Sequence, residues 1–239
     1  MRRFLFWSLC FCLLFPVGLS SCDGSDSAAV IFGGTTGKLT WTLTEDGVLT
    51  ITGEGPMPDY RDGGTSETPP WYPHVNRISS LTIGEGVTRI GDYAFMLCSF
   101  VTKVVIPESV TSMGDWAFYL CTGLQEAYIG DGVTEIAAKA FAECTALKTV
   151  VIGKSIQRIG DQAFNTRSSW DQMTLEKITV LFDDIASGSF PVLESGSRGV
   201  FPKPGGWDLV SYKIYVPKGT KAEYQKNWSD YSSLIVEMQ

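Results

Sequence analysis

The sequence is poor in the residues that catalysis and nucleic-acid binding require. His74 is its only histidine, and 26 acidic side chains outnumber 19 basic ones. A protein that tracks phosphates needs a basic surface, and a serine or cysteine nucleophile usually needs a histidine base. We therefore expect no nucleic-acid partner, no cofactor and no enzymatic activity. A hydrolase built on loop carboxylates stays open as an alternative, because two carboxylates can meet in a fold without any sequence motif.

The start of the chain also lacks a hydrophobic run long enough to cross a membrane. The apolar run of residues 4–17 is shorter than the roughly 20 residues of a spanning helix. It follows Arg2 and Arg3 and precedes small residues, which is the layout of a secretory leader. The Leu-Ser-Ser-Cys segment of residues 19–22 resembles the lipobox of bacterial lipoproteins. This resemblance implies cleavage before Cys22, lipid attachment there, and a place in the cell envelope, at the outer membrane or cell surface. An ordinary leader without lipid is the alternative.

A period of 23 residues dominates the middle of the chain. Isoleucine and phenylalanine both recur at this spacing, as Ile83, Ile106, Ile129 and Ile152 and as Phe95, Phe118, Phe141 and Phe164. A fixed period is the signature of a solenoid, in which neighbouring coils complete each other's core. Alternating apolar residues, as in 147–153, predict one strand per repeat. In three of the repeats an aspartate, such as Asp92, lies just before the Ala-Phe pair. This pattern predicts a short helical or 3₁₀ turn with the aspartate as its N-cap.

Three cysteines follow the same period. Cys98, Cys121 and Cys144 lie 23 residues apart, whereas Cys10 and Cys12 belong to the leader. Such a ladder is typical of small buried side chains that fill a turn. Stacked strands lie about 4.8 Å apart, so a disulfide between neighbours stays open, but three thiols cannot all pair. The ladder contains no histidine, and we expect no metal there.

Segments on either side of the repeats predict caps. Residues 39–43 and 48–52 alternate across an Asp-Gly turn, which predicts a β-hairpin that shields the first coil. Residues 53–76 are rich in Gly and Pro and carry aromatic side chains that we expect to pack on this cap. After the repeats, a long loop at 183–207 precedes a last strand and an amphipathic capping helix.

The repeat motif Ile-Gly/Pro-x-x-Val-x-x-Ile-Gly-x-x-Ala-Phe-x-x-Cys-x-x-Leu resembles the BspA-type leucine-rich repeat of bacterial surface proteins. Residues 37–53 and 69–72 resemble the module that often precedes such repeats, and residues 215–228 resemble their closing segment. The resemblance implies an α/β repeat solenoid of parallel strands and short helical or 3₁₀ turns, with an N-terminal hairpin cap and a C-terminal cap. It carries no catalytic motif and implies adhesion or recognition outside the cell.

The outward side of the predicted strands provides a candidate binding site. Val105, Tyr128 and Val151 occupy one outward column, and Lys103 and Glu126 flank it. Three consecutive apolar residues on a solvent-facing column are more than solubility favours. Our hypothesis is that these five residues bind a host or bacterial surface protein or glycan. The high β-propensity of Val and Tyr is the alternative explanation.

These interpretations divide the chain into five parts. They are a signal peptide at 1–21, a polar tether at 22–36, the hairpin cap and its loop at 37–80, the repeats at 81–182, and the loop insertion, last strand and C-terminal cap at 183–239. The predicted function is recognition by a surface protein that a lipid anchors to the membrane. A structural component of an envelope assembly is the alternative, since it would dock through the same face.

Overall fold

The computed structural model describes residues 28–62, 67–166, 174–184, 190–194, 199–202 and 212–239. The signal peptide and the lipid attachment site, Cys22, lie outside these residues, as does part of the loop at 183–207. The predictions for those segments therefore stay predictions.

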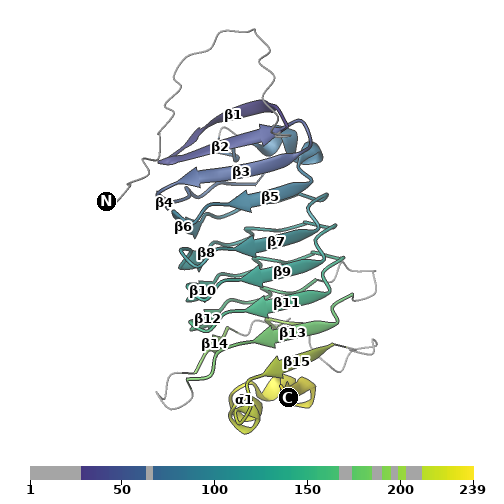
Figure 1. The fold of residues 1–239 in the computed structure, drawn as a ribbon. Coiled ribbons are helices and arrows are strands. Elements are labelled where there is room, and N and C mark those ends of the chain that lie inside the picture. Colours follow the sequence, from purple (N-terminus) through teal and green to yellow (C-terminus); the bar gives the residue numbers. More distant parts are fainter. Residues whose placement is uncertain (1–27, 63–66, 167–173, 185–189, 195–198, 203–211) are drawn as a thin grey trace, which may run out of the picture.

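The described residues form an elongated solenoid whose coils stack on one another from end to end (Figure 1). The first parallel sheet contains, in order, β7 (Lys103–Ile106), β9 (Glu126–Ile129), β11 (Thr149–Ile152), β13 (Lys177–Val180), β15 (Lys213–Val216) and β16 (Ile235–Glu237). The second contains β4 (Gly55–Pro56), β6 (Val87–Ile90), β8 (Ser112–Met113), β10 (Glu135–Ile136), β12 (Arg158–Ile159) and β14 (Val192–Leu193). We call the outer surface of the first sheet the strand face. This arrangement confirms the predicted repeat solenoid.

Alternation along each strand decides which side chains enter the core. In β7, Val104 and Ile106 are buried, while Lys103 and Val105 are exposed. Strands pair in parallel at equivalent positions of the repeat, so that Ile106 lies beside Ile129. Because strand side chains point alternately to opposite faces, the 23-residue period stacks like positions into columns.

The Asp-x-Ala-Phe segments of the repeats hydrogen-bond to the next coil. In the first repeat, the backbone N–H groups of Tyr93 and Leu97 donate to the carbonyls of Asp115 and Tyr119 in the next coil. Tyr93 and Leu97 adopt left-handed φ values of 55° and 65°, which turn these amides toward that coil. The Asp92 side chain differs from its predicted role as an N-cap of its own turn. Its Oδ1 accepts the Asp115 backbone N–H at 3.0 Å and so caps the next coil.

A continuous stack of aromatic rings runs through the core. The predicted phenylalanine ladder gains one ring at each end and reads Trp71, Phe95, Phe118, Phe141, Phe164, Phe201. Successive ring centroids lie between 5.0 and 5.7 Å apart, and every ring is buried. The burial of Trp71 confirms that aromatic residues of 53–76 pack on the cap. Its indole N–H donates to the carbonyl of Ala94, which ties the cap to the first coil.

The cysteine ladder is buried beside this stack. Cys98, Cys121 and Cys144 are free thiols. The Cys121 Sγ donates to the carbonyl of Phe95, and the Cys144 Sγ makes the same contact with Phe118, both at 3.1 Å. Burial raises the pKa of the Cys98 and Cys121 thiols well above the ordinary value. The ladder is therefore a packing element of the turn, and its thiols are not poised as nucleophiles.

The predicted hairpin continues the strand face beyond the repeats. Its strands are β2 (Leu39–Thr44) and β3 (Val48–Gly53), which pair antiparallel on either side of Asp46-Gly47. β3 then pairs in parallel with β5 (Ser80–Ile83), and β5 lies next to β7 in the stack (Figure 1). The hairpin thus covers the edge that the first coil would otherwise expose.

The N-terminal cap is larger than the sequence indicated. The sequence predicts a polar tether at residues 22–36, but residues 30–36 form β1 (Val30–Thr36), antiparallel to β2. Phe32 packs against the core, which gives this strand an anchor. At Gly34, an added Cβ would lie 3.1 Å from the Trp41 indole nitrogen, so the glycine allows close approach. A 3₁₀ helix, η1 (Tyr72–Arg77), completes this end.

The C-terminal cap closes the other end of the aromatic stack. It consists of α1 (Lys221–Asn227), η3 (Ser229–Leu234) and β16, which confirms the predicted capping helix. The Tyr231 ring meets Phe201 edge to face with centroids 5.4 Å apart. The Tyr224 hydroxyl donates to the Phe182 carbonyl at 2.8 Å. The last ring of the stack is therefore covered by aromatic side chains.

Candidate functional site

The five residues predicted to bind a ligand lie on three neighbouring strands of the strand face. β7, β9 and β11 pair in register, which places Tyr128 between Val105 and Val151. Lys103 and Glu126 are neighbours in the adjacent column. The Val105 residue is 54% exposed, and Tyr128 and Val151 are half-buried. We call these five residues the strand patch.

Charged side chains orient the tyrosine at the centre of the strand patch. The Lys103 Nζ lies 4.6 Å from the centroid of the Tyr128 ring and 3.6 Å from Glu126 Oε2. These side chains are accessible to solvent, so each contact is worth at most about 1 kcal/mol. The two contacts restrain the Tyr128 ring before a partner binds. A ring that is already restrained loses less conformational entropy on binding.

The column that contains the strand patch passes through the buried Thr179 and reaches Tyr215, which the sequence did not connect with it. Thr179 of β13 follows Val151, and Tyr215 of β15 follows Thr179. The Lys177 Nζ lies 4.9 Å from the Tyr215 ring centroid, in the same lysine and tyrosine arrangement as in the strand patch. The chain between β13 and β15 exceeds one period, and the residue count therefore could not place Tyr215 in this column.

His74 is packed against a neighbouring ring. It stacks on Phe32 with ring centroids 3.8 Å apart, and Arg77 lies on the same ring. Partial burial and the charge of Arg77 lower the pKa of His74. Within the described ranges, no group of three or more His, Cys, Asp or Glu side chains is placed to hold a metal ion. None of the helices in these ranges has the length and apolar character to span a bilayer.

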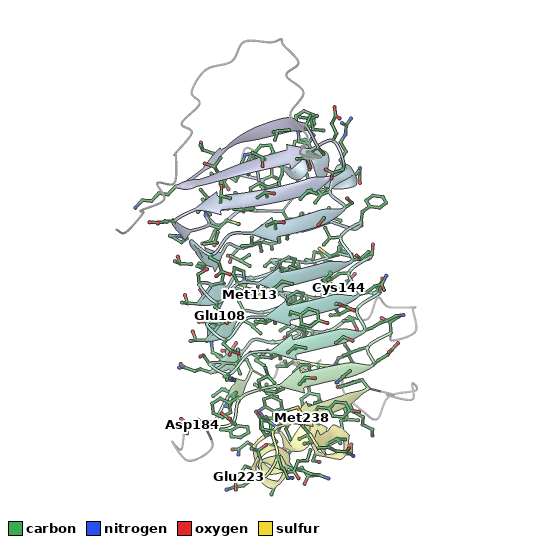
Figure 2. The ribbon with its side chains drawn as sticks, in the orientation of Figure 1. Glu108, Met113, Cys144, Asp184, Glu223 and Met238 are labelled. Atoms are coloured by element: carbon green, nitrogen blue, oxygen red, sulfur yellow. The ribbon has the colours of Figure 1, made fainter. Side chains whose placement is uncertain are left out.

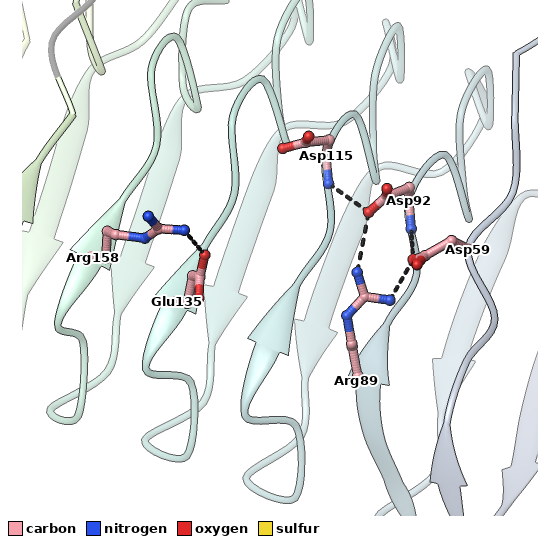
Figure 3. A network of polar contacts seen from close by, with 6 residues as sticks. All are labelled: Asp59, Arg89, Asp92, Asp115, Glu135 and Arg158. Carbon is pink, nitrogen blue, oxygen red and sulfur yellow. Dashed lines mark hydrogen bonds and ion pairs between the residues drawn. The ribbon is translucent and has the colours of Figure 1, made fainter.

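Charged side chains also link neighbouring coils on the second sheet. Arg158 pairs with Glu135 of the preceding coil (Figure 3), and it also pairs with Glu194 at 2.7 Å. Arg89 makes the corresponding contacts with Asp59 and Asp92. Each pair is partly exposed and adds little stability by itself. The second group differs because its carboxylates line a cavity.

The similarity to known proteins lies mainly in the repeats. The family model described as BspA type Leucine rich repeat region matches residues 72–190 in 6 copies. A leucine-rich repeat protein from Eubacterium ventriosum ATCC 27560 shares 27% identity and a TM-score of 0.57, over 81% of this chain and 46% of that one. This chain therefore spans less than half the length of that protein.

Two further solved structures are similar at lower identity. The pneumococcal vaccine antigen PcpA is 19% identical with a TM-score of 0.46, over 68% of this chain and 36% of that one. A leucine rich cell surface protein from Faecalibacterium prausnitzii A2-165 is 20% identical with a TM-score of 0.37, over 78% and 70% of the two chains. No curated protein matches this chain.

Proposed function

This chain carries a BspA type leucine-rich repeat region, and from that premise we propose that it recognises a protein partner outside the cell through the strand patch. The observation that carries this proposal is the row of Val105, Tyr128 and Val151 on adjacent strands, with Val105 54% exposed. The scaffold leaves outward positions free to vary while the inward positions build the core.

The composition of the strand patch suits a protein surface. Protein interfaces combine an apolar, often aromatic centre with a polar rim, and Tyr is among the residues that dominate binding energy. Here the apolar row lies beside Lys103 and Glu126, which offer one charge of each sign. A specific interface covers about 800 Å² on each partner, so the five residues would form its centre. Tyr215 lies further along the same column, one strand beyond the buried Thr179.

The predicted leader favours a location outside the cell, where the protein would encounter such a partner. Lipid attachment at Cys22 would hold the protein on the membrane, and the residues after it would link the lipid to the solenoid. The partner would then be a protein of a host or of another bacterial surface. The alternative function of the same face is that the strand patch docks within an envelope assembly.

Binding of residues 23–239 to arrays of host matrix proteins, mucins and bacterial surface proteins tests the proposal. Tyr128→Asp places a charge at the centre of the strand patch and should reduce affinity at least tenfold. Thr88→Asp, on an exposed position of β6 in the second sheet, is the matched control and should bind as the wild type does.

Two results would contradict the proposal. If Tyr128→Asp binds as tightly as the wild type, recognition does not use the strand patch. If the wild type binds nothing on the arrays but assembles with envelope proteins of its own cell in cross-linking, the assembly role replaces recognition.

A further inference from the structure

A cavity of about 780 Å³ opens where the N-terminal cap meets the first repeat. β1 supplies Thr35 and Thr36, the segment after β4 supplies residues 59–61, and the first turn of the repeats supplies Asp92 and Tyr93. The volume lies within the range of small-molecule sites, roughly 300–1,000 Å³. No residue of the strand patch lines this cavity, so it is a second and separate site.

Arg89 pairs with Asp59 and Asp92, two carboxylates that line the cavity. Figure 3 shows these three side chains and their contacts. The Arg89 Nη2 lies 3.2 Å from Asp92 Oδ1. Asp59 Oδ1 also accepts the Asp92 N–H, and Asp92 Oδ1 accepts the Asp115 N–H, both at 3.0 Å. In the part of the chain that the structure describes, all these bonds use Oδ1 and none uses Oδ2. Both carboxylates are thus fixed in place, and the Oδ2 atom of each can still accept a hydrogen bond.

An aromatic side chain forms one wall of the cavity. The Tyr93 ring stacks on Trp116 of the next coil with planes 5° apart and centroids 6.1 Å apart. Trp116 is itself held by Lys139, whose Nζ lies 4.1 Å from its centroid, and by the edge contact with Tyr119 at 4.6 Å. These supports all come from the side away from the cap. Tyr93 therefore meets the cavity as a ring that is braced from behind.

The backbone under this ring does not require an aromatic residue. Tyr93 and Trp116 have φ values of 55° and 58°, and Lys139 and Gln162 have 58° at the equivalent positions. Glycine and asparagine adopt this left-handed conformation most readily, and other side chains pay about 1–2 kcal/mol. A bulky ring at such a position is consistent with a role beyond the fold.

From this geometry we propose that the cavity binds a neutral carbohydrate, with one sugar ring stacked on Tyr93 and hydroxyl groups donating to Asp59 and Asp92. A sugar combines an apolar C–H face with a rim of hydroxyl groups, which matches an aromatic wall beside fixed acceptors. Arg89 is already paired with both aspartates, and Arg61 pairs with Glu67 at 2.8 Å. Three carboxylates against two guanidinium groups disfavour sialylated or sulfated sugars.

The test is a glycan array probed with the full chain purified in detergent. One arm holds neutral oligosaccharides of mucin type, and the other holds neutral fragments of bacterial polysaccharides, so that a hit in either arm supports the proposal and identifies the source. Tyr93→Asn removes the ring but suits the left-handed backbone, and it should reduce binding at least tenfold. Tyr93→Phe keeps the stacking surface and should retain binding within about threefold. Gln162→Asn, at the equivalent position two coils beyond Trp116, is the matched control and should not change binding.

The carbohydrate site is independent of the proposed protein recognition, and the variants separate the two. Tyr128→Asp should leave glycan binding intact, and Tyr93→Asn should leave protein binding intact. The carbohydrate proposal is overturned if no neutral glycan binds in either arm, or if Tyr93→Asn binds as the wild type does. Urea unfolding of Tyr93→Asn checks that lost binding does not reflect lost folding.

Discussion

The rings of Phe118 and Phe141 stack with centroids 5.0 Å apart and planes within 2° of parallel. The two residues hold the same position in successive repeats, and both are buried. Each ring therefore fills the space between two coils, and the core of one coil depends on its neighbours. Figure 2 shows side chains occupying the solenoid along its length.

Phe141→Ala should lower the free energy of unfolding by about 3–5 kcal/mol, the usual cost of truncating a buried phenylalanine. Phe141 lies between Phe118 and Phe164, at 5.0 and 5.2 Å, so its loss leaves a cavity in the middle of the stack. Urea unfolding followed by circular dichroism measures the change. Phe100→Ala is the control, because Phe100 is 58% exposed and should cost less than about 1 kcal/mol. Equal effects of the two substitutions would mean that the ring stack does not govern stability.

Gly47→Ala should destabilise the protein more than Gly219→Ala. Both glycines have nearly the same backbone, with φ values of 84° and 83°. A Cβ at Gly47 would lie 2.4 Å from the Arg77 carbonyl oxygen, whereas a Cβ at Gly219 meets nothing within 4 Å. Gly219→Ala should therefore cost only the left-handed strain of about 1–2 kcal/mol. Gly47→Ala should cost a further 1–3 kcal/mol or so for steric overlap. Thermal unfolding of both variants compares them directly, and a smaller effect at Gly47 would show that the hairpin turn can move away from Arg77.

Asp59→Asn should destabilise the protein at pH 7 more than Asp92→Asn does. Partial burial opposes the Asp59 charge, but bonds from the Asp92 N–H and Arg89 outweigh it and hold the pKa of Asp59 below 3.8. Its carboxylate thus contributes stability above pH 3.8 that is lost as the pH falls through the lower folded-state pKa. Burial, with the charge of Asp59 nearby, raises the pKa of Asp92, so its negative charge is unfavourable at neutral pH.

The pH dependence of the unfolding free energy provides the control for the Asp59→Asn and Asp92→Asn variants. The difference in unfolding free energy between the wild type and Asp59→Asn should narrow as the pH falls from 7 to 3, because the wild-type carboxylate takes up its proton. Urea titrations at both pH values measure it. A difference that stays constant with pH, or a larger effect of Asp92→Asn at pH 7, would contradict the assigned roles.

The strand patch illustrates how far the periodic part of the chain can be predicted. Val105, Tyr128 and Val151 share one position of a 23-residue repeat, and strands of equal length and spacing stack in register. Their neighbourhood and outward direction therefore follow from counting residues. The hairpin could be predicted for a similar reason, because its alternation and its Asp46-Gly47 turn are local signals.

Several features at the two ends of the solenoid could not be predicted, because their residues do not follow the 23-residue period. Trp71 and Phe201 complete the aromatic stack, but neither lies 23 residues from its neighbour in the stack. Tyr215 joins the outward column only after a long connection. β1 contains two consecutive glycines and lacks a repeated partner, so its sequence resembles a linker until β2 offers it an edge.

The sequence by itself determined the solenoid, since a strict period specifies both the core columns and the outward columns. It also determined the cysteine ladder as a packing element. Only the tertiary structure decided the cavity of Asp59, Asp92 and Tyr93, because β1, the segment after β4 and the first turn of the repeats meet there from distant parts of the chain. A period describes contacts between equivalent residues, and a site built from non-equivalent residues at the junction of cap and repeat has no period to reveal it.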